Sequence, residues 1–169
     1  LADEITERDS LLLHTPQSLA SALALDVRTG HEVLSVDAAA HRVQVRERAT
    51  GREYTEPYDT LVLSTGAAPV IPPLPGVDSP SVRVLRTVMD VDALRALVDG
   101  GARRAIVVGA GFIGLETAEA LRHRGLEVTL VELADQVLPP LDPEMSRSVQ
   151  RGLAKGRVDV RLSTSLTGI

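Results

Sequence analysis

The strongest constraint on the fold is a glycine-rich turn that joins an apolar segment to an amphipathic one. The sequence Val-Val-Gly-Ala-Gly-Phe-Ile-Gly (residues 107–114) leaves a predicted strand over residues 104–108 and opens a predicted helix over residues 112–124. A second predicted strand, residues 127–131, leads directly into Glu132, 18 residues beyond Gly114. This order and spacing are typical of the strand–turn–helix–strand unit that binds a dinucleotide.

The positions of this turn have distinct physical roles, and Ile113 lies among them. Gly109 permits the tight turn, Gly111 lets a pyrophosphate approach the backbone, and Gly114 allows the helix to lie close to the sheet. The N–H groups that begin the helix attract phosphate. Glu132 would accept hydrogen bonds from the adenosine ribose hydroxyls and repel a 2′-phosphate, which favours NAD over NADP. Taken singly, Gly111 is also compatible with an ordinary turn glycine, and Glu132 with a solvated acid.

Two further side chains of the predicted helix leave two interpretations open. Glu116 is expected in its first turn, where an acid complements the helix dipole. Phe112, the only Phe of the chain, is compatible with a packing contact between helix and sheet. Both lie beside the predicted dinucleotide loop, so a role in the site is the alternative for each.

The chain after residue 78 predicts an α/β fold with a Rossmann-like, three-layer parallel sheet. Strands and helices alternate there, and short connections of this kind require parallel pairing and right-handed crossovers. Asp90 is expected to cap a helix over residues 91–98. A last helix is expected from Asp142, with Met145, Val149 and Leu153 on its buried face, before a strand over residues 158–162.

The chain before residue 78 predicts a β-rich region. Alternating apolar residues indicate short strands at residues 33–36, 43–45 and 53–55, and a nearly continuous apolar run over residues 59–64 indicates a buried strand. A proline-rich stretch follows at residues 69–76, which neither a helix nor a central strand tolerates. It predicts two domains, residues 1–78 and residues 79–169; the alternative is a long surface loop within one domain.

Composition excludes several classes of function. The chain has 18 basic and 23 acidic residues and a net charge of −5, which argues against nucleic acid as a partner. Its longest apolar run is far shorter than the ~20 residues that span a bilayer, so no membrane association is expected. Without cysteine it offers no thiol nucleophile, and its four histidines show no metal-ligand spacing. We therefore expect neither a metal site nor a catalytic residue within this chain.

Four segments in sequence order are similar to a known family: residues 31–33 (His-Glu-Val), 58–69 (Tyr-Asp through Gly-Ala-Ala-Pro), 109–116 (Gly-Ala-Gly-Phe-Ile-Gly-Leu-Glu) and 127–132 (Glu-Val-Thr-Leu-Val-Glu). Together they resemble the pyridine nucleotide–disulfide oxidoreductases over nearly the whole chain. Residues 136–145 look most like the coenzyme A–disulfide reductase branch, whose neighbours are NADH oxidases, peroxidases and persulfide reductases.

The resemblance implies that the chain is an internal piece of a longer flavoprotein. Residues 1–78 would be the latter part of the first FAD-binding segment, and residues 79–169 an NAD domain without its last strands. The first FAD glycine loop and the redox cysteine would lie upstream of Leu1. The parent is expected to be a cytoplasmic homodimer, whereas the fragment alone is expected to show no turnover and little FAD binding.

The resemblance also assigns roles to individual residues. Val33 is similar to the position whose backbone meets the FAD adenine, and Thr65 with Gly66 to a second FAD contact. Phe112 matches an aromatic residue, often Tyr, that covers the flavin until nicotinamide displaces it. Glu116 matches an acid near the nicotinamide and the flavin.

The implied activity is hydride transfer from NADH to FAD and on to a redox-active cysteine centre, which reduces a disulfide, persulfide or peroxide. The coenzyme A branch commonly has a basic residue after the segment that ends at Pro16, but residues 19–23 read Leu-Ala-Ser-Ala-Leu, so coenzyme A is not assigned as the substrate. Alternatives are an NADH oxidase, a ferredoxin- or nitrite-reductase-type flavoprotein, an NADP-dependent dehydrogenase, and an NAD-binding regulatory module without catalysis.

Overall fold

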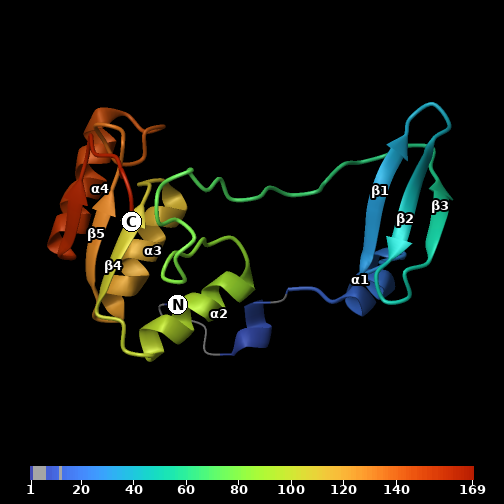
Figure 1. The fold of residues 1–169 in the computed structure, drawn as a ribbon, viewed down its shortest axis with the longest axis horizontal. Helices are drawn as coiled ribbons and strands as arrows, with labels where there is room; N and C mark the ends of the chain where they lie inside the picture. The colour runs from blue at the N-terminus through green and yellow to red at the C-terminus, as the bar shows by residue number, and fades with distance from the viewer. Residues whose placement is uncertain (2–6, 12) are drawn as a thin grey trace. The chain divides into compact units, whose positions relative to one another are not determined.

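The computed structural model describes residues 1, 7–11 and 13–169, with the side chains of residues 8 and 9 left out. The chain forms two compact units, one over Glu7–Gly66 and one over Ala67–Ile169 that also includes Leu1 (Figure 1). The domain boundary after residue 78 stays a prediction.

The first unit is a three-stranded antiparallel sheet preceded by two short helices. Its elements are η1 (Arg8–Leu11), α1 (Pro16–Leu23), β1 (His31–Asp37), β2 (Arg42–Glu47) and β3 (Glu53–Pro57), and the strand order is β1-β2-β3. The three predicted strands are thus confirmed. Val43 and Val45 of β2 are buried, as the alternation of apolar and charged residues in that strand predicts.

The strand predicted over residues 59–64 is wrong, because this segment has no regular structure. Val62 and Leu63 are 80% and 72% exposed. None of the described strands pairs with the segment, and an apolar strand without neighbours buries little surface.

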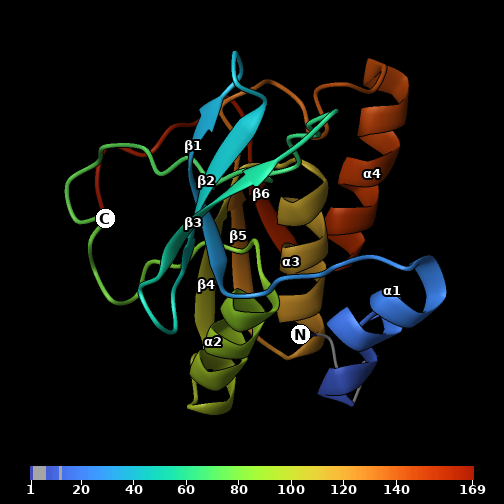
Figure 2. The same ribbon diagram turned by 90° about the vertical axis from the view of Figure 1, so that its right-hand side faces the viewer.

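The second unit alternates helices and strands, as predicted: α2 (Val88–Asp99), β4 (Arg104–Val108), α3 (Phe112–His123), β5 (Glu127–Val131), α4 (Pro143–Lys155) and β6 (Val158–Arg161). The strands form a parallel sheet in the order β4-β5-β6. Helices α3 and α4 cover one face of this sheet (Figure 2). The core lies between them and the strands, where Ala118, Leu121 and Leu153 meet Val128 and Leu130.

Helix α2 begins earlier than the sequence suggested. Its N-cap is Thr87, whose hydroxyl accepts a hydrogen bond from the Asp90 N–H, while the Asp90 carboxylate accepts one from the Thr87 N–H. Asp90 is therefore the third helical residue of a capping box and not the cap itself.

The buried face of α4 also differs from the prediction. Met145 is 59% exposed, whereas its neighbour Ser146 is 1% exposed and Leu153 is buried. The inward stripe therefore runs through Ser146, Val149 and Leu153. The prediction placed Met145 on the buried face because methionine is more hydrophobic than serine.

Two kinds of feature are missing from the described part of the chain. None of its helices has the length and apolar character needed to cross a membrane. Its His, Asp and Glu side chains also form no group of three or more that could hold a metal ion.

Candidate functional site

The predicted dinucleotide loop lies at the carboxyl ends of the neighbouring strands β4 and β5. Gly109 follows β4 with a φ of 98°, a left-handed conformation that a side chain disfavours. Its N–H donates to the Val131 carbonyl over 2.8 Å, which continues the ladder between β4 and β5. The chain then turns directly into α3, whose N-cap is Gly111.

The other two glycines of the loop differ in what surrounds them. A Cβ added to Gly114 would lie 1.9 Å from the Gly109 carbonyl oxygen, so the first turn of α3 touches the loop backbone. A Cβ added to Gly111 would meet nothing within 4 Å. Packing therefore explains Gly114, while the open space at Gly111 is available to a ligand that approaches the backbone.

The start of α3 carries no side-chain cap, because its N-cap is a glycine. The first N–H groups of a helix have no partner within the helix. Together with the helix dipole they favour an anion at this end. The loop is therefore chemically suited to a phosphate group.

Glu132 follows β5 and its side chain reaches the glycine loop. One carboxylate oxygen accepts a hydrogen bond from the Ala110 N–H over 2.6 Å, and the other accepts one from the Ala134 N–H over 2.8 Å. The acid predicted from spacing is thus brought into contact with the predicted loop. A carboxylate offers about four acceptor positions, so about two remain for a ligand.

The surroundings of Glu132 keep it ionised. Partial burial by itself raises the pKa of this carboxyl, but the hydrogen bonds from the Ala134 and Ala110 N–H groups outweigh that effect and bring the pKa below its usual value. Hydrogen bonds of this kind stabilise the charged form. At neutral pH the site therefore presents a negative charge beside the loop.

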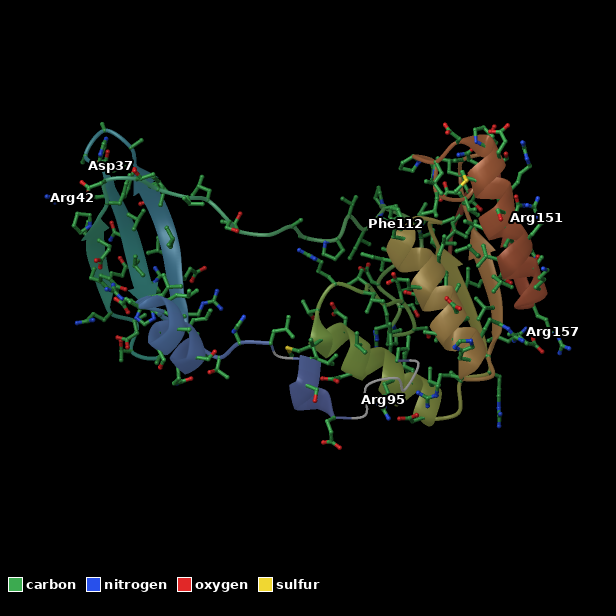
Figure 3. All side chains as sticks on the ribbon, turned by 180° about the vertical axis from the view of Figure 1, so that it is seen from behind. Asp37, Arg42, Arg95, Phe112, Arg151 and Arg157 are labelled. Atoms are coloured by element: carbon green, nitrogen blue, oxygen red, sulfur yellow. The ribbon has the colours of Figure 1, made fainter. Side chains whose placement is uncertain are left out.

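Three more predicted site residues lie on the exposed side of α3. Phe112 and Ile113 are 64% and 56% exposed, and Figure 3 shows Phe112 at the first turn of the helix. Glu116 is exposed as well, but it is the fifth helical residue and so lies in the second turn. The prediction that it lies in the first turn is wrong, because the helix begins at Phe112 and a turn takes 3.6 residues.

The remaining predicted site residues belong to the first unit. Val33 lies in β1 opposite Val45, next to an irregularity in the pairing with β2, and lines a hollow of about 400 Å³. Thr65 and Gly66 are exposed at the end of that unit, and Gly66 has a φ of 73°. Their roles in binding stay predictions, as do those of the residues in the second unit.

The sequence did not single out Ala110, Leu138 or Ser146, although all three support the loop. Ala110 is completely buried, and its carbonyl accepts a hydrogen bond from the Leu138 N–H. The Ser146 hydroxyl donates to the carbonyl of Val137. Neither an alanine between two glycines nor a helical serine carries a recognisable signal, because these contacts depend on where the following loop runs.

Comparison with known proteins identifies relatives over almost all of the chain. The family model described as "Pyridine nucleotide-disulphide oxidoreductase" matches residues 4–169. An NADH oxidase of Methanocaldococcus jannaschii is 41% identical over 95% of this chain and 36% of its own length. A coenzyme A disulfide reductase of Staphylococcus haemolyticus is 32% identical over 98% of this chain and 37% of its own length. The chain thus spans little more than a third of these relatives.

Solved structures give the same picture. The reduced CoADR-RHD of Bacillus anthracis superposes with a TM-score of 0.92 at 37% identity, covering 99% of this chain and 30% of that one. An NAD-dependent persulfide reductase from A. fulgidus gives a TM-score of 0.92 at 34% identity, over 99% and 31% of the two chains. An engineered NADPH oxidase, made by five substitutions in the water-forming NADH oxidase of Lactobacillus brevis, gives a TM-score of 0.87 at 27% identity, over 99% and 37%.

Proposed function

The chain belongs to the pyridine nucleotide-disulphide oxidoreductases, and from this premise we propose that its full-length parent passes a hydride from NADH to FAD and on to a redox-active cysteine centre. The observation that carries the proposal is the contact between the glycine loop and the Glu132 carboxylate. This contact brings a backbone suited to binding phosphate next to an acid suited to binding ribose hydroxyls. Both elements are needed to bind the adenosine half of NADH.

This chain would bind and orient the nucleotide. The N–H groups at the uncapped start of α3 would hold the diphosphate, Gly111 would leave room for it, and Glu132 would accept hydrogen bonds from the ribose hydroxyls. When bound, NADH supplies the hydride and FAD accepts it. The exposed Phe112 would cover the flavin side of the site and move aside for nicotinamide, and Glu116 would lie near the carboxamide.

The charge of Glu132 favours NADH over NADPH, because a carboxylate repels a 2′-phosphate. The engineered NADPH oxidase supports this preference. Its first two substitutions have the spacing of Gly114 and Glu132 in this chain, and the second replaces an aspartate with alanine. The other three fall at the spacing of Leu133, Ala134 and Pro139, and two of them introduce arginine. This chain has no basic residue at those positions.

The first unit would contribute part of the FAD site. Val33 would meet the adenine through its backbone in β1, which is an edge strand of the sheet that the described residues form. Thr65 and Gly66 would form a second contact, and the positive φ of Gly66 is suited to a backbone that passes close to a dinucleotide. The parent would be a cytoplasmic homodimer.

The electron acceptor would be a small-molecule disulfide, persulfide or peroxide. The names of the relatives support a disulfide and a persulfide, since they include a coenzyme A disulfide reductase and a persulfide reductase. An NADH oxidase is the second candidate, because the relative at 41% identity has that name.

Purified full-length protein tests the proposal. We expect flavin absorbance in the isolated protein and its bleaching by NADH without oxygen. Reoxidation by coenzyme A disulfide, a persulfide, hydrogen peroxide or oxygen then identifies the acceptor. A colourless protein that binds NADH without turnover would instead indicate a regulatory module, and equal use of NADH and NADPH would contradict the role given to Glu132.

A further inference from the structure

The loop that follows β5 is hydrogen-bonded to the glycine loop through both the backbone N–H and the backbone carbonyl of one buried residue, Ala110. We name residues 132–141 the clamp segment. The Ala110 N–H donates to the Glu132 carboxylate over 2.6 Å, and the Ala110 carbonyl accepts from the Leu138 N–H over 2.9 Å. Ala110 has no exposed surface, so the loss of either bond would leave a buried backbone group without its partner. The clamp segment therefore holds the two peptide groups on either side of the Ala110 Cα in the nucleotide-free chain.

The clamp segment is in turn fixed from helix α4. The Ser146 hydroxyl donates to the Val137 carbonyl over 2.7 Å, and both residues are almost fully buried. The same peptide group carries the Leu138 N–H, which donates to the Ala110 carbonyl. An unbroken series of hydrogen bonds and peptide links thus joins Ser146 to the glycine loop.

Resting on the proposed function, we propose that Ser146 is a positioning residue for pyridine-nucleotide binding. It acts through Val137 and Leu138 on Ala110 and touches no part of the nucleotide itself. Its hydroxyl holds the clamp segment so that Glu132 stands beside the loop and the N–H groups at the start of α3 point toward the diphosphate. An apolar residue at position 146 would leave the buried Val137 carbonyl without a donor, and a buried unpaired carbonyl favours a rearranged loop.

Although the Glu132 carboxylate accepts hydrogen bonds from the protein backbone, it keeps acceptor positions for the ribose hydroxyls. Ala110 and Ala134 use one acceptor position on each carboxylate oxygen, which leaves about two free. The same side chain thus holds the loop and remains able to accept hydrogen bonds from a diol.

The test is the variant Ser146→Ala in the full-length protein, with Ser148→Ala as the matched control. Ser148 lies on the same helix but is exposed. We expect Ser146→Ala to raise the KM and Kd for NADH about five- to tenfold, the effect of one buried hydrogen bond, with kcat within about twofold of the wild type. Ser148→Ala should change none of these values.

Two further measurements separate positioning from a loss of stability. Combined with Glu132→Gln, Ser146→Ala should weaken NADH binding by less than the product of the separate effects, because both act on Ala110. Hydrogen exchange in the nucleotide-free wild type should show slow exchange at the Ala110 and Leu138 amides, and this needs no variant to fold.

Three outcomes overturn the proposal: an unchanged Kd for NADH in folded Ser146→Ala, multiplicative effects of Ser146→Ala and Glu132→Gln, or rapid exchange at the Ala110 and Leu138 amides. If the wild type and Ser148→Ala bind no NADH, the proposed function fails instead, and the hydrogen-exchange result still decides whether the clamp segment holds the loop.

Discussion

Replacing Glu132 with alanine should move the nucleotide preference of the full-length protein from NADH toward NADPH. About two acceptor positions of the carboxylate are free for the ribose hydroxyls, since Ala110 and Ala134 occupy the others. Two hydrogen bonds to a charged group contribute about 3 kcal/mol or more together, which corresponds to about a 100-fold loss in kcat/KM for NADH. NADPH loses no such contact and is no longer repelled.

The ratio of kcat/KM for NADH to that for NADPH isolates this effect. Loss of the Ala110 contact disturbs the loop for both nucleotides and therefore cancels in the ratio. We expect the ratio to fall about 100-fold or more, from initial-rate kinetics with each nucleotide.

Two further variants serve as controls for the change in the NADH to NADPH ratio. Glu119→Ala removes the same charge from an exposed position on α3 and should leave the ratio unchanged. Glu132→Gln keeps an acceptor oxygen without the charge and should give an intermediate ratio. A ratio that changes less than about threefold in Glu132→Ala, while NADH still binds, would refute a ribose contact through this side chain.

Three other perturbations have defined outcomes. Gly114→Ala puts a methyl group against the Gly109 carbonyl, so the loop must shift; NADH titration should show weaker binding, and unchanged affinity would contradict the close approach. The depressed pKa of Glu132 means that its ionised contacts are fully present above the ordinary carboxyl pKa of about 4.3 and disappear only as the pH falls through the lower value in the folded protein. NADH affinity should therefore stay constant down to that ordinary value and decrease only below it, and this decrease should be absent in Glu132→Ala. Thr87→Ala removes the N-cap of α2 and should cost about 1 kcal/mol, visible as a lower melting temperature, whereas an unchanged melting temperature would show that the capping box contributes nothing.

The agreement between sequence and structure is greatest where the signal is local. The alternation of Val43 and Val45 with charged residues gave β2 correctly, and the order of strand and helix signals gave the parallel sheet. These patterns depend on the period of a strand or helix, which neighbouring residues alone establish. The spacing from Gly114 to Glu132 likewise placed the acid beside the loop.

The failures concern tertiary contacts and the points at which helices begin. The apolar run over residues 59–64 has the composition of a buried strand, yet none of the described strands pairs with it. Asp90 is a good capping residue by type, but Thr87 three positions earlier takes that role. A strand requires partners for its peptide groups, and a helix begins where a suitable pair of side chains meets.

The chain's own sequence determined the glycine loop, the helix behind it and the acid at the end of the next strand, because a tight turn, a helical start and a parallel crossover follow from neighbouring residues. Only the tertiary structure decided that Ala110 is held on both sides and that Ser146, not Met145, turns inward. A buried carbonyl needs a donor wherever the folded chain places it, and the Val137 carbonyl meets α4 only after the sheet and helices have assembled.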